Sequence, residues 1–240
     1  MIQVYNADQR YQASHGWLHT AFSFSFADYY DPNNLQFGPM RVLNDDYIEG
    51  GNGFGMHPHR EMEIVTLVLS GKLEHRDSLG NQAVTTWGGI QRMSAGSGVF
   101  HSEMNPSSDE PVSLLQMWFL PQTPGLDPSY ETSSFPVDDL RGKLVPVVSG
   151  DAALQKSGAV AQIHQDMTMY LTELSSDETL TFRQADGRRV FLFVLEGSVG
   201  VRAGEQDVRL GRRDSARVEG SSELLLSGHG ESRLLVIDLP

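Results

Sequence analysis

An internal repeat is the sequence feature that most limits the folds open to this chain. Each copy places a glycine between two short apolar runs, which is typical of a β-hairpin. The spacing between the copies is nearly constant, so the repeat predicts two copies of one β unit, one in each half of the chain. The matched segments are Val68-Leu69-Ser70-Gly71-Lys72-Leu73 with Val194-Leu195-Glu196-Gly197-Ser198-Val199, Gly80-Asn81-Gln82-Ala83-Val84 with Gly204-Glu205-Gln206-Asp207-Val208, and Gly96 with Gly220.

Strand signals recur along both halves, and helix signals are sparse. The turn-forming segment 77–81 (Asp-Ser-Leu-Gly-Asn) predicts a tight hairpin, and the apolar run 114–120 predicts a strand covered on both faces. Many short strands with little helix indicate a sandwich or barrel, so we expect an all-β fold. The predicted strands are 41–48, 63–69, 72–75, 113–120, 160–174, 190–195, 198–202 and 234–239.

The stretch from residue 125 to residue 150 is rich in Pro, Gly, Ser and Asp, as expected of a linker between two halves. A chain of 240 residues is long enough for two small β domains. We therefore expect an N-terminal domain over residues 1–130 and a C-terminal domain over residues 131–240.

Composition excludes several classes of function. The chain has no Cys, so disulfides, Cys-ligated zinc, iron–sulfur clusters and thiol nucleophiles are ruled out. Its formal net charge of −13 argues against direct binding to nucleic acid or to an anionic membrane. The sequence shows no signal-peptide pattern, and its longest apolar runs are too short to cross a bilayer. We expect a soluble, cytoplasmic protein.

Two short strings, His57-Pro58-His59 and His101-Ser102-Glu103, carry most of the chemical information. Each places two metal-ligand side chains at positions i and i+2, which a β-strand points to the same face. If two neighbouring strands bring the pairs together, three imidazoles and one carboxylate converge on one point. Such a set suits a divalent first-row transition metal and leaves coordination positions open. Solvated surface histidines are the alternative for either pair alone, but the two pairs together favour a metal site.

The second copy of the repeat lacks these ligands. Extending the alignment places Arg183 and Ala185 opposite His57 and His59. It places Leu225 and Ser227 opposite His101 and Glu103. We therefore expect the N-terminal domain to hold the metal and the C-terminal domain to have lost it.

The spacing of these motifs resembles that of a known superfamily. Residues 51–71 read G-x5-H-x-H-x3-E-x7-G, and residues 98–105 read G-x2-H-x3-N, similar to the two cupin motifs except for small spacing differences and Gly96 where Pro is usual. Longer segments resemble the pirin family, whose bacterial members are named pirin-like quercetin 2,3-dioxygenases. The resemblance implies a bicupin, in which two tandem jelly-roll β-barrels pack together. The segments that carry it are 19–32, 41–46, 57–60, 94–98 and 101–105.

By this resemblance the metal ligands are His57, His59, His101 and Glu103. Fe(II) is the first expectation for the metal, with Mn, Ni, Cu or Zn as alternatives. Glu63 matches the glutamate of the general cupin motif but is left out of the ligand set. The resemblance further implies that the protein opens the central ring of flavonols such as quercetin with O2 and releases carbon monoxide. Glu103 would accept the proton of the 3-hydroxyl group as general base.

Other side chains have weaker predictions. Phe54, Met56, Met93 and Phe100 are candidates for an apolar slot around a planar ring, although each alone reads more simply as a core residue. Among the remaining histidines, we expect His19 to line or brace the pocket, and we expect solvated residues at positions 15, 75 and 229. For His164 we expect an ordinary strand residue, with a contact to a metal ligand as the alternative.

Two other functions stay open on sequence grounds. One is a regulatory metal-binding module that docks a protein partner, as eukaryotic members of the family do. The other is an oxygenase or isomerase that acts on a different small enol, because fold and ligands do not name a substrate. On each enzyme reading the partners are a small aromatic substrate and O2, and a monomer is the expected oligomeric state.

Overall fold

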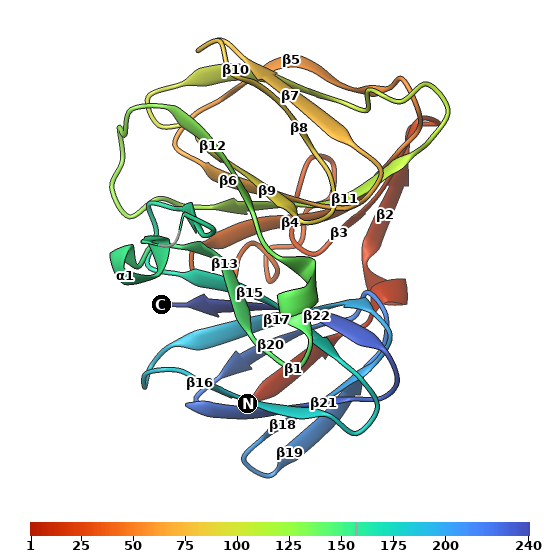
Figure 1. Cartoon of the computed structure of the whole chain (residues 1–240), viewed down its shortest axis with the longest axis vertical. Helices are drawn as coiled ribbons and strands as arrows, with labels where there is room; N and C mark the ends of the chain where they lie inside the picture. Colours follow the sequence, from red (N-terminus) through yellow and green to blue (C-terminus); the bar gives the residue numbers. More distant parts are fainter. Residues whose placement is uncertain (157) are drawn as a thin grey trace. The chain divides into compact units, whose positions relative to one another are not determined.

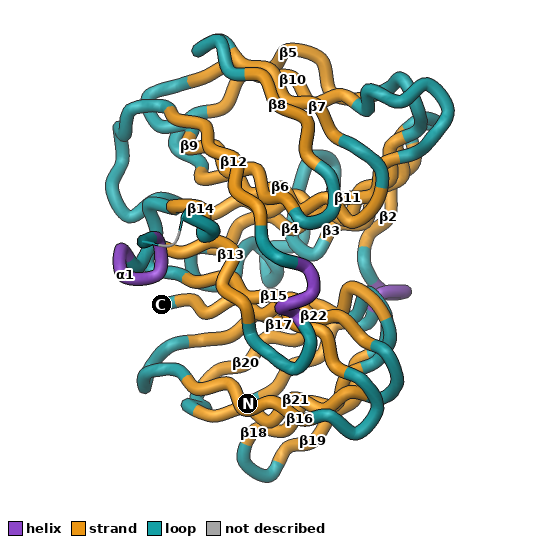
Figure 2. The backbone as a smooth tube through the Cα atoms, viewed as in Figure 1, coloured by secondary structure: helices purple, strands orange, loops and turns teal. Residues whose placement is uncertain are grey.

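The computed structural model describes residues 1–156 and 158–240. It is built almost entirely of strands (Figures 1 and 2), so the all-β expectation is confirmed. Among the described residues, no helix combines the length and apolar character that crossing a membrane requires. The helical segments are η1 (Ala7–Gln9), η2 (Val137–Leu140) and α1 (Ala152–Gln155).

The chain divides into two compact units. The N-terminal unit comprises Tyr11–Phe135 and Gln155–Gln165, and the C-terminal unit comprises Met1–Arg10, Pro136–Leu154 and Asp166–Pro240. The first ten residues join the C-terminal unit because β1 (Ile2–Tyr5) pairs antiparallel with β20 (Ser215–Glu219). The predicted domains, residues 1–130 and 131–240, stay a prediction. No local sequence signal indicates the long-range pairing of β1 with β20.

The N-terminal unit is a sandwich of two sheets. Its strands are β2 (Tyr11–Ser14), β3 (Leu18–Phe22), β4 (Met40–Ile48), β5 (Gly53–His59), β6 (Glu63–Ser70), β7 (Leu73–Asp77), β8 (Gln82–Thr85), β9 (Gly89–Ser94), β10 (Val99–Met104), β11 (Val112–Phe119), β12 (Ser129–Ser134) and the short β14 (Ala161–Gln162). The larger sheet has the order β12-β9-β6-β11-β4-β3-β2, and the smaller has the order β5-β10-β7-β8 (Figure 1).

The C-terminal unit repeats this plan. Its strands are β1 and β20, given above, with β13 (Val145–Ser149), β15 (Thr168–Leu174), β16 (Thr179–Arg183), β17 (Arg189–Glu196), β18 (Val199–Ala203), β19 (Gln206–Leu210), β21 (Glu223–Gly228) and β22 (Ser232–Leu239). The larger sheet runs β1-β20-β17-β22-β15-β13, and the smaller runs β16-β21-β18-β19. The smaller sheet matches β5-β10-β7-β8 strand for strand, which supports the internal repeat.

Seven of the eight predicted strands have a counterpart whose ends lie within two residues of the prediction. The β7–β8 hairpin also forms at the predicted turn. The predicted strand over residues 160–174 is wrong, because the structure has β14 and β15 there with a non-strand segment between them. That segment carries Gln165 and Asp166, polar residues that interrupt the apolar run.

The interior of the N-terminal unit is apolar at its two ends and polar in the middle. Because alternate residues of a strand share a face, Leu114, Gln116 and Trp118 of β11 point the same way. Leu114 belongs to an apolar cluster with Leu18, and Trp118 packs against a second cluster. Gln116 lies between them and pairs across the ladder with Thr66 of β6. The candidate site forms at this polar middle part of the interior, around Gln116 and Thr66.

The C-terminal unit has an apolar cluster in its interior, which includes Leu224, Leu226 and Val201. Leu226 pairs with Val201 there, just as Glu103 pairs with His75 in the N-terminal unit. Strand register therefore matches Glu103 to Leu226 and corrects the sequence alignment, which had placed Ser227 there. A shift of one residue moves every side chain of a strand to its opposite face. The corrected alignment therefore matches the four predicted ligands to residues that point inward, where the sequence alignment had matched them to residues that point outward. By the same register His57, His59 and His101 match Phe182, Gln184 and Leu224.

Close packing between β5 and β10 leads to a first prediction. A Cβ atom on Gly53 would collide with the carbonyl oxygen of Glu103, whereas one on Gly55 of the same strand would meet no described atom within 4 Å. We expect Gly53→Ala to lower the free energy of unfolding by roughly 1–3 kcal/mol because the backbone must shift. Gly55→Ala, the matched control, should change it by less than about 0.5 kcal/mol. Urea unfolding of both variants checks this, and equal effects would contradict it.

Candidate metal centre

Strand pairing brings the three predicted histidines together. β5 supplies His57 and His59, and β10 supplies His101, which lies directly opposite His57 in the ladder. The ring nitrogens of the three lie within 4.8 Å of one another. The shortest separation is 3.0 Å, between Nε2 of His57 and Nε2 of His101. The structure thus places the three imidazoles around one point, and their role as metal ligands stays a prediction.

Glu103 reaches the same region from the interior of the sandwich. Its buried carboxylate accepts hydrogen bonds from Nε2 of Gln116 at 2.6 Å and from Oγ1 of Thr66 at 3.4 Å. It lies within 4.8 Å of ring nitrogens of His75 and His101 and so belongs to a second, overlapping cluster. Burial raises the pKa of Glu103 to about 7, aided by the nearby Asp46 and opposed by the bonds from Gln116 and Thr66.

Burial keeps the imidazoles of His59 and His101 neutral. Burial, followed by the neighbouring His57, lowers the pKa of His59 to about 4. Burial and three surrounding histidines lower the pKa of His101 to about 2, with Asp77 acting weakly in the opposite direction. Neutral imidazoles beside a buried carboxylate offer lone pairs and one negative charge, which is the donor set that divalent transition metals take. The residues present therefore fit the metal that the sequence predicts.

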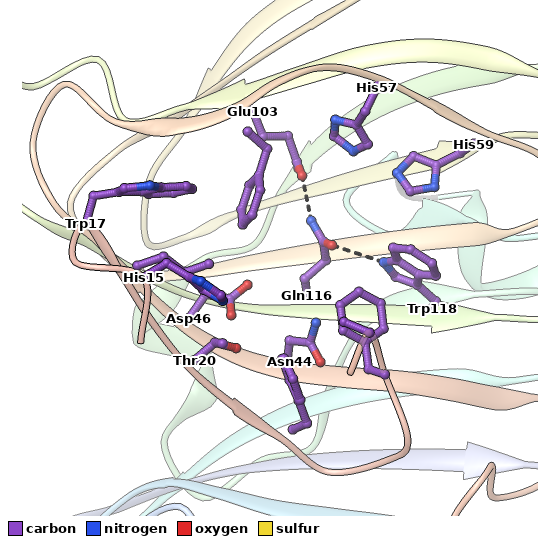
Figure 3. Close-up of a pocket in the computed structure, with 15 residues that line it drawn as sticks. His15, Trp17, Thr20, Asn44, Asp46, His57, His59, Glu103, Gln116 and Trp118 are labelled. Carbon is purple, nitrogen blue, oxygen red and sulfur yellow. Dashed lines mark hydrogen bonds between the residues drawn. The ribbon is translucent and has the colours of Figure 1, made fainter. Parts of the chain in front are cut away.

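A cavity of about 360 Å³ opens beside these side chains, and its walls are largely aromatic. Figure 3 shows His57, His59 and Glu103 along one side of it, with Thr20, Asn44 and Asp46 facing them. The lining residues are His15, Trp17, Leu18, Thr20, Phe22, Phe26, Ala27, Asn44, Asp46, Phe54, His57, His59, Glu103, Gln116 and Trp118.

Gln116 connects the carboxylate to the aromatic wall. Its Oε1 accepts a hydrogen bond of 3.0 Å from Nε1 of Trp118, and its Nε2 donates to Glu103 (Figure 3). The indole N–H fixes which end of the amide is oxygen, so the amide N–H necessarily faces Glu103. The sequence analysis did not identify Gln116 and Trp118 as site residues, although it predicted their strand and both point to its inward face.

The predicted apolar slot is only partly correct. Phe54 lines the cavity. Met56 and Phe100 are 59% and 53% exposed, because each lies one residue from a clustered histidine and points to the opposite face of its strand. Met93 is buried in an apolar cluster of the larger sheet, outside the lining of the cavity.

The prediction for His75 is wrong. It is only 2% exposed, and its Nε2 lies 3.1 Å from Oδ2 of Asp77. Its ring stacks on Tyr130 with the centroids 4.0 Å apart, and its Nδ1 lies 3.4 Å from Nδ1 of His101. The local sequence His-Arg-Asp before a turn looked solvated, but β12 contributes a tyrosine from far along the chain that covers the ring.

The other weakly predicted residues lie as follows. His15 and His229 are exposed, as expected, although His15 also lines the cavity. His19 is exposed beside Tyr47 and is not among the residues that line the cavity. His164 lies in a bend rather than a strand, and its backbone N–H donates to Glu63. Glu63 belongs to neither of the clusters found among the described residues.

The chain is similar to known proteins along its whole length. The profile of the family described as Pirin matches residues 4–119, and that of the quercetinase C-terminal cupin domain matches residues 146–239. A protein of Escherichia coli K12 named quercetin 2,3-dioxygenase is 42% identical over 240 residues, which cover 100% of this chain and 99% of that protein. A pirin-like protein of Caulobacter vibrioides is 37% identical, with 94% of each chain covered.

Solved structures agree with these relatives. The crystal structure of YhhW from Escherichia coli superposes with a TM-score of 0.93 at 40% identity and covers 100% of this chain and 98% of that one. A crystal structure of the same bacterial pirin in complex with nickel(II) gives a TM-score of 0.92 at 40% identity, with 100% of this chain and 99% of that one covered.

Proposed function

Because this chain belongs to the pirin family, we propose that it is a metal-dependent dioxygenase that opens the central ring of flavonols such as quercetin. The reaction would consume O2 and release carbon monoxide. The name of the 42% identical Escherichia coli relative supports this choice of reaction. The observation that carries the proposal is the cluster of His57, His59 and His101, with the buried Glu103 in an overlapping cluster through His101, beside a cavity with aromatic walls.

His57, His59, His101 and Glu103 would hold the metal, with Fe(II) as the first choice and Mn, Ni, Cu or Zn as alternatives. The nickel(II) complex of the Escherichia coli pirin supports a divalent ion in this family. When bound, the metal supplies a positive charge that favours the ionised form of a substrate hydroxyl, together with exchangeable coordination positions. The chain's own part is to hold these side chains around the site and to keep His59 and His101 unprotonated, because burial lowers the pKa of both.

Glu103 is suited to take the proton of the flavonol 3-hydroxyl group. It is the carboxylate of the cluster that lines the cavity, and Gln116 donates to one of its oxygens at 2.6 Å. Among the described residues, the other oxygen then has only the long contact of 3.4 Å from Thr66. A carboxylate held in this way can accept a proton without rotating out of position.

The aromatic walls suit a planar substrate. Trp17 and Phe54 meet edge to face with centroids 5.5 Å apart, and Phe26 and Trp118 do the same at 5.3 Å. The cavity volume of about 360 Å³ lies in the range of small-molecule sites, roughly 300–1,000 Å³. Apolar walls also exclude water from the reacting carbon, which favours attack by oxygen over hydrolysis.

Oxygen consumption tests the proposal. Protein loaded with Fe(II) should consume O2 with quercetin and produce carbon monoxide, and His57→Ala should lose at least about 100-fold of the rate. His19→Ala is the matched control, because this histidine is exposed and outside the cavity lining. It should keep the rate within about twofold. Equal rates for wild type and His57→Ala would overturn the proposal, as would O2 uptake with other enols but none with flavonols.

A further inference from the structure

A chain of hydrogen bonds leads away from the metal centre through two side chains that the proposed reaction does not use. Oδ2 of Asp77 lies 3.1 Å from Nε2 of His75, and Nδ1 of His75 lies 3.4 Å from Nδ1 of His101. The side chains of His75 and Asp77 are 2% and 0% exposed, so water does not compete for these contacts. The opposite nitrogen of His101, Nε2, faces His57 in the candidate centre.

Asp77 is held at the far end of this chain by its own turn. Its Oδ1 accepts hydrogen bonds from the backbone N–H groups of Leu79 and Asn81, and its Oδ2 accepts one from Nδ2 of Asn81. Burial alone would raise the pKa of Asp77, but these bonds and the one from His75 outweigh it and leave the pKa below its ordinary value. Asp77 is thus a fixed carboxylate that requires a donor from His75.

The position of the carboxylate decides the tautomers of both rings. A neutral His75 places its proton on Nε2 to donate to Asp77, which leaves its Nδ1 as an acceptor. The facing Nδ1 of His101 then carries a proton and donates to it. His101 is left with an unprotonated Nε2, directed into the candidate metal centre. Nδ1 of His57 donates to the carbonyl oxygen of Gly55 at 2.8 Å, so its Nε2 is unprotonated as well. The two Nε2 atoms, 3.0 Å apart, thus present lone pairs to the same point, an arrangement suited to a cation between them.

The ring of His75 is also fixed against rotation. It stacks nearly parallel on Tyr130, with an interplanar angle of 9°, and the Tyr130 hydroxyl donates to Oε1 of Gln91 at 2.7 Å. The ring of His75 therefore has little freedom to exchange its two nitrogen atoms by a flip. We call the pair formed by Asp77 and His75 the relay.

We propose that Asp77 and His75 act as positioning residues that fix His101 in the tautomer whose Nε2 lone pair faces the metal. This inference rests on the metal site of the proposed function but does not depend on the substrate. A carboxylate–histidine pair behind a metal-ligating histidine holds the orientation of that ligand and increases its basicity.

The C-terminal unit supports this assignment independently. Continuing the strand register that matches Val201 to His75 places Ala203 at the position of Asp77. The relay is therefore replaced by apolar side chains in the unit whose matched positions also carry none of the four predicted ligands. A purely structural role in the shared fold would have favoured keeping the pair in both units.

The tautomers can be measured in metal-free protein. Long-range ¹H–¹⁵N correlation of the imidazoles separates protonated from unprotonated ring nitrogens. We expect a proton on Nε2 of His75 and a proton on Nδ1 of His101. A proton on Nε2 of His101 in the folded, metal-free protein would overturn the proposal, whatever the enzyme does with quercetin.

A single substitution should exchange the protonated and unprotonated ring nitrogens of both His75 and His101. In Asp77→Asn the two backbone N–H donors hold the side-chain oxygen at the position of Oδ1, so the amide NH2 group faces His75. His75 then carries its proton on Nδ1 and donates to His101, whose Nε2 becomes protonated and is no longer free for a metal. We expect the affinity for nickel(II), measured by chelator competition, to fall about 10- to 100-fold, together with the reversed ¹⁵N pattern.

Glu74→Gln is the matched control. This residue lies on the same strand, and its side chain contacts Arg76 and Gln82 rather than the relay. It should leave nickel(II) affinity and both tautomers unchanged. A second variant, His75→Phe, keeps an aromatic ring against Tyr130 but removes the acceptor, and it should also weaken nickel(II) binding. Wild-type affinity in folded Asp77→Asn and His75→Phe would overturn the proposal, whereas tight metal binding without quercetin turnover would contradict only the proposed function.

Discussion

Replacement of Glu103 by glutamine is expected to reduce quercetin-dependent oxygen uptake by roughly 10²- to 10⁴-fold. The amide has nearly the same shape, and its oxygen can still accept the bond from Gln116, which lies 2.6 Å from the carboxylate. It cannot take the proton of a substrate hydroxyl, and it removes the negative charge from the candidate metal centre. Steady-state O2 consumption, normalised to the metal content of each preparation, measures the effect.

Two further variants make this result interpretable. Glu103→Asp keeps a carboxylate on a shorter side chain and should retain more activity than Glu103→Gln at equal metal content. Glu110→Gln makes the same chemical change at an exposed residue of the same unit and should leave the rate within about twofold. Full activity of metal-loaded Glu103→Gln would eliminate Glu103 as the base and leave the proton acceptor to another group.

The core of the candidate site was predictable because it depends on the period of a strand. Two ligand-type residues at i and i+2 must share a face, and the glycine-rich hairpins between the two strings allow their strands to become neighbours. The pairing of His57 with His101 follows from this local rule and from one correct assumption about strand order. The internal repeat also predicted that the two units share one strand plan, because it too depends on a local pattern of apolar runs separated by glycines.

Burial from distant segments was not predictable. His75 looked like a solvated turn residue, since its sequence neighbours are Arg76 and Asp77, but Tyr130 covers its ring. The error in aligning Ser227 with Glu103 has a similar origin, because a one-residue shift in a repeat is invisible without the ladder register. In both cases the missing information is a contact between strands, which the local sequence does not encode.

The aromatic wall of the cavity was predictable only in part. Alternation along β5 and β10 excludes Met56 and Phe100 from the cavity, since their neighbours His57 and His101 point inward. The same rule would also exclude Phe54, which lines the cavity because the register between β5 and β10 shifts between Phe54 and His57. The same alternation would have selected Trp118 once Gln116 was placed inside. The positions of Phe22 and Phe26 depend on how the segment before β4 folds back, which no local pattern specifies.

A buried acid opposite the candidate metal centre leads to the second large effect, on stability. Asp46 is 4% exposed, and burial raises its pKa from 3.8 to about 7, with Thr20 opposing the shift and Asp45 adding to it. Between these two pH values the folded protein binds a proton that the unfolded chain has lost. The stability that Asp46 contributes is therefore fully present below pH 3.8 and is lost as the pH rises through about 7.

Asp46→Asn should remove this dependence, because the amide keeps the shape and stays neutral. We expect metal-free Asp46→Asn to be more stable than wild type at pH 8, by up to about 4 kcal/mol, with a much smaller difference at pH 5. Urea unfolding of the metal-free proteins at the two pH values measures the change. Asp127→Asn, at an exposed residue of the same unit, should show no such dependence. If the difference between wild type and Asp46→Asn is the same at both pH values, Asp46 does not titrate in this range, and its carboxylate is stabilised by contacts that outweigh its burial.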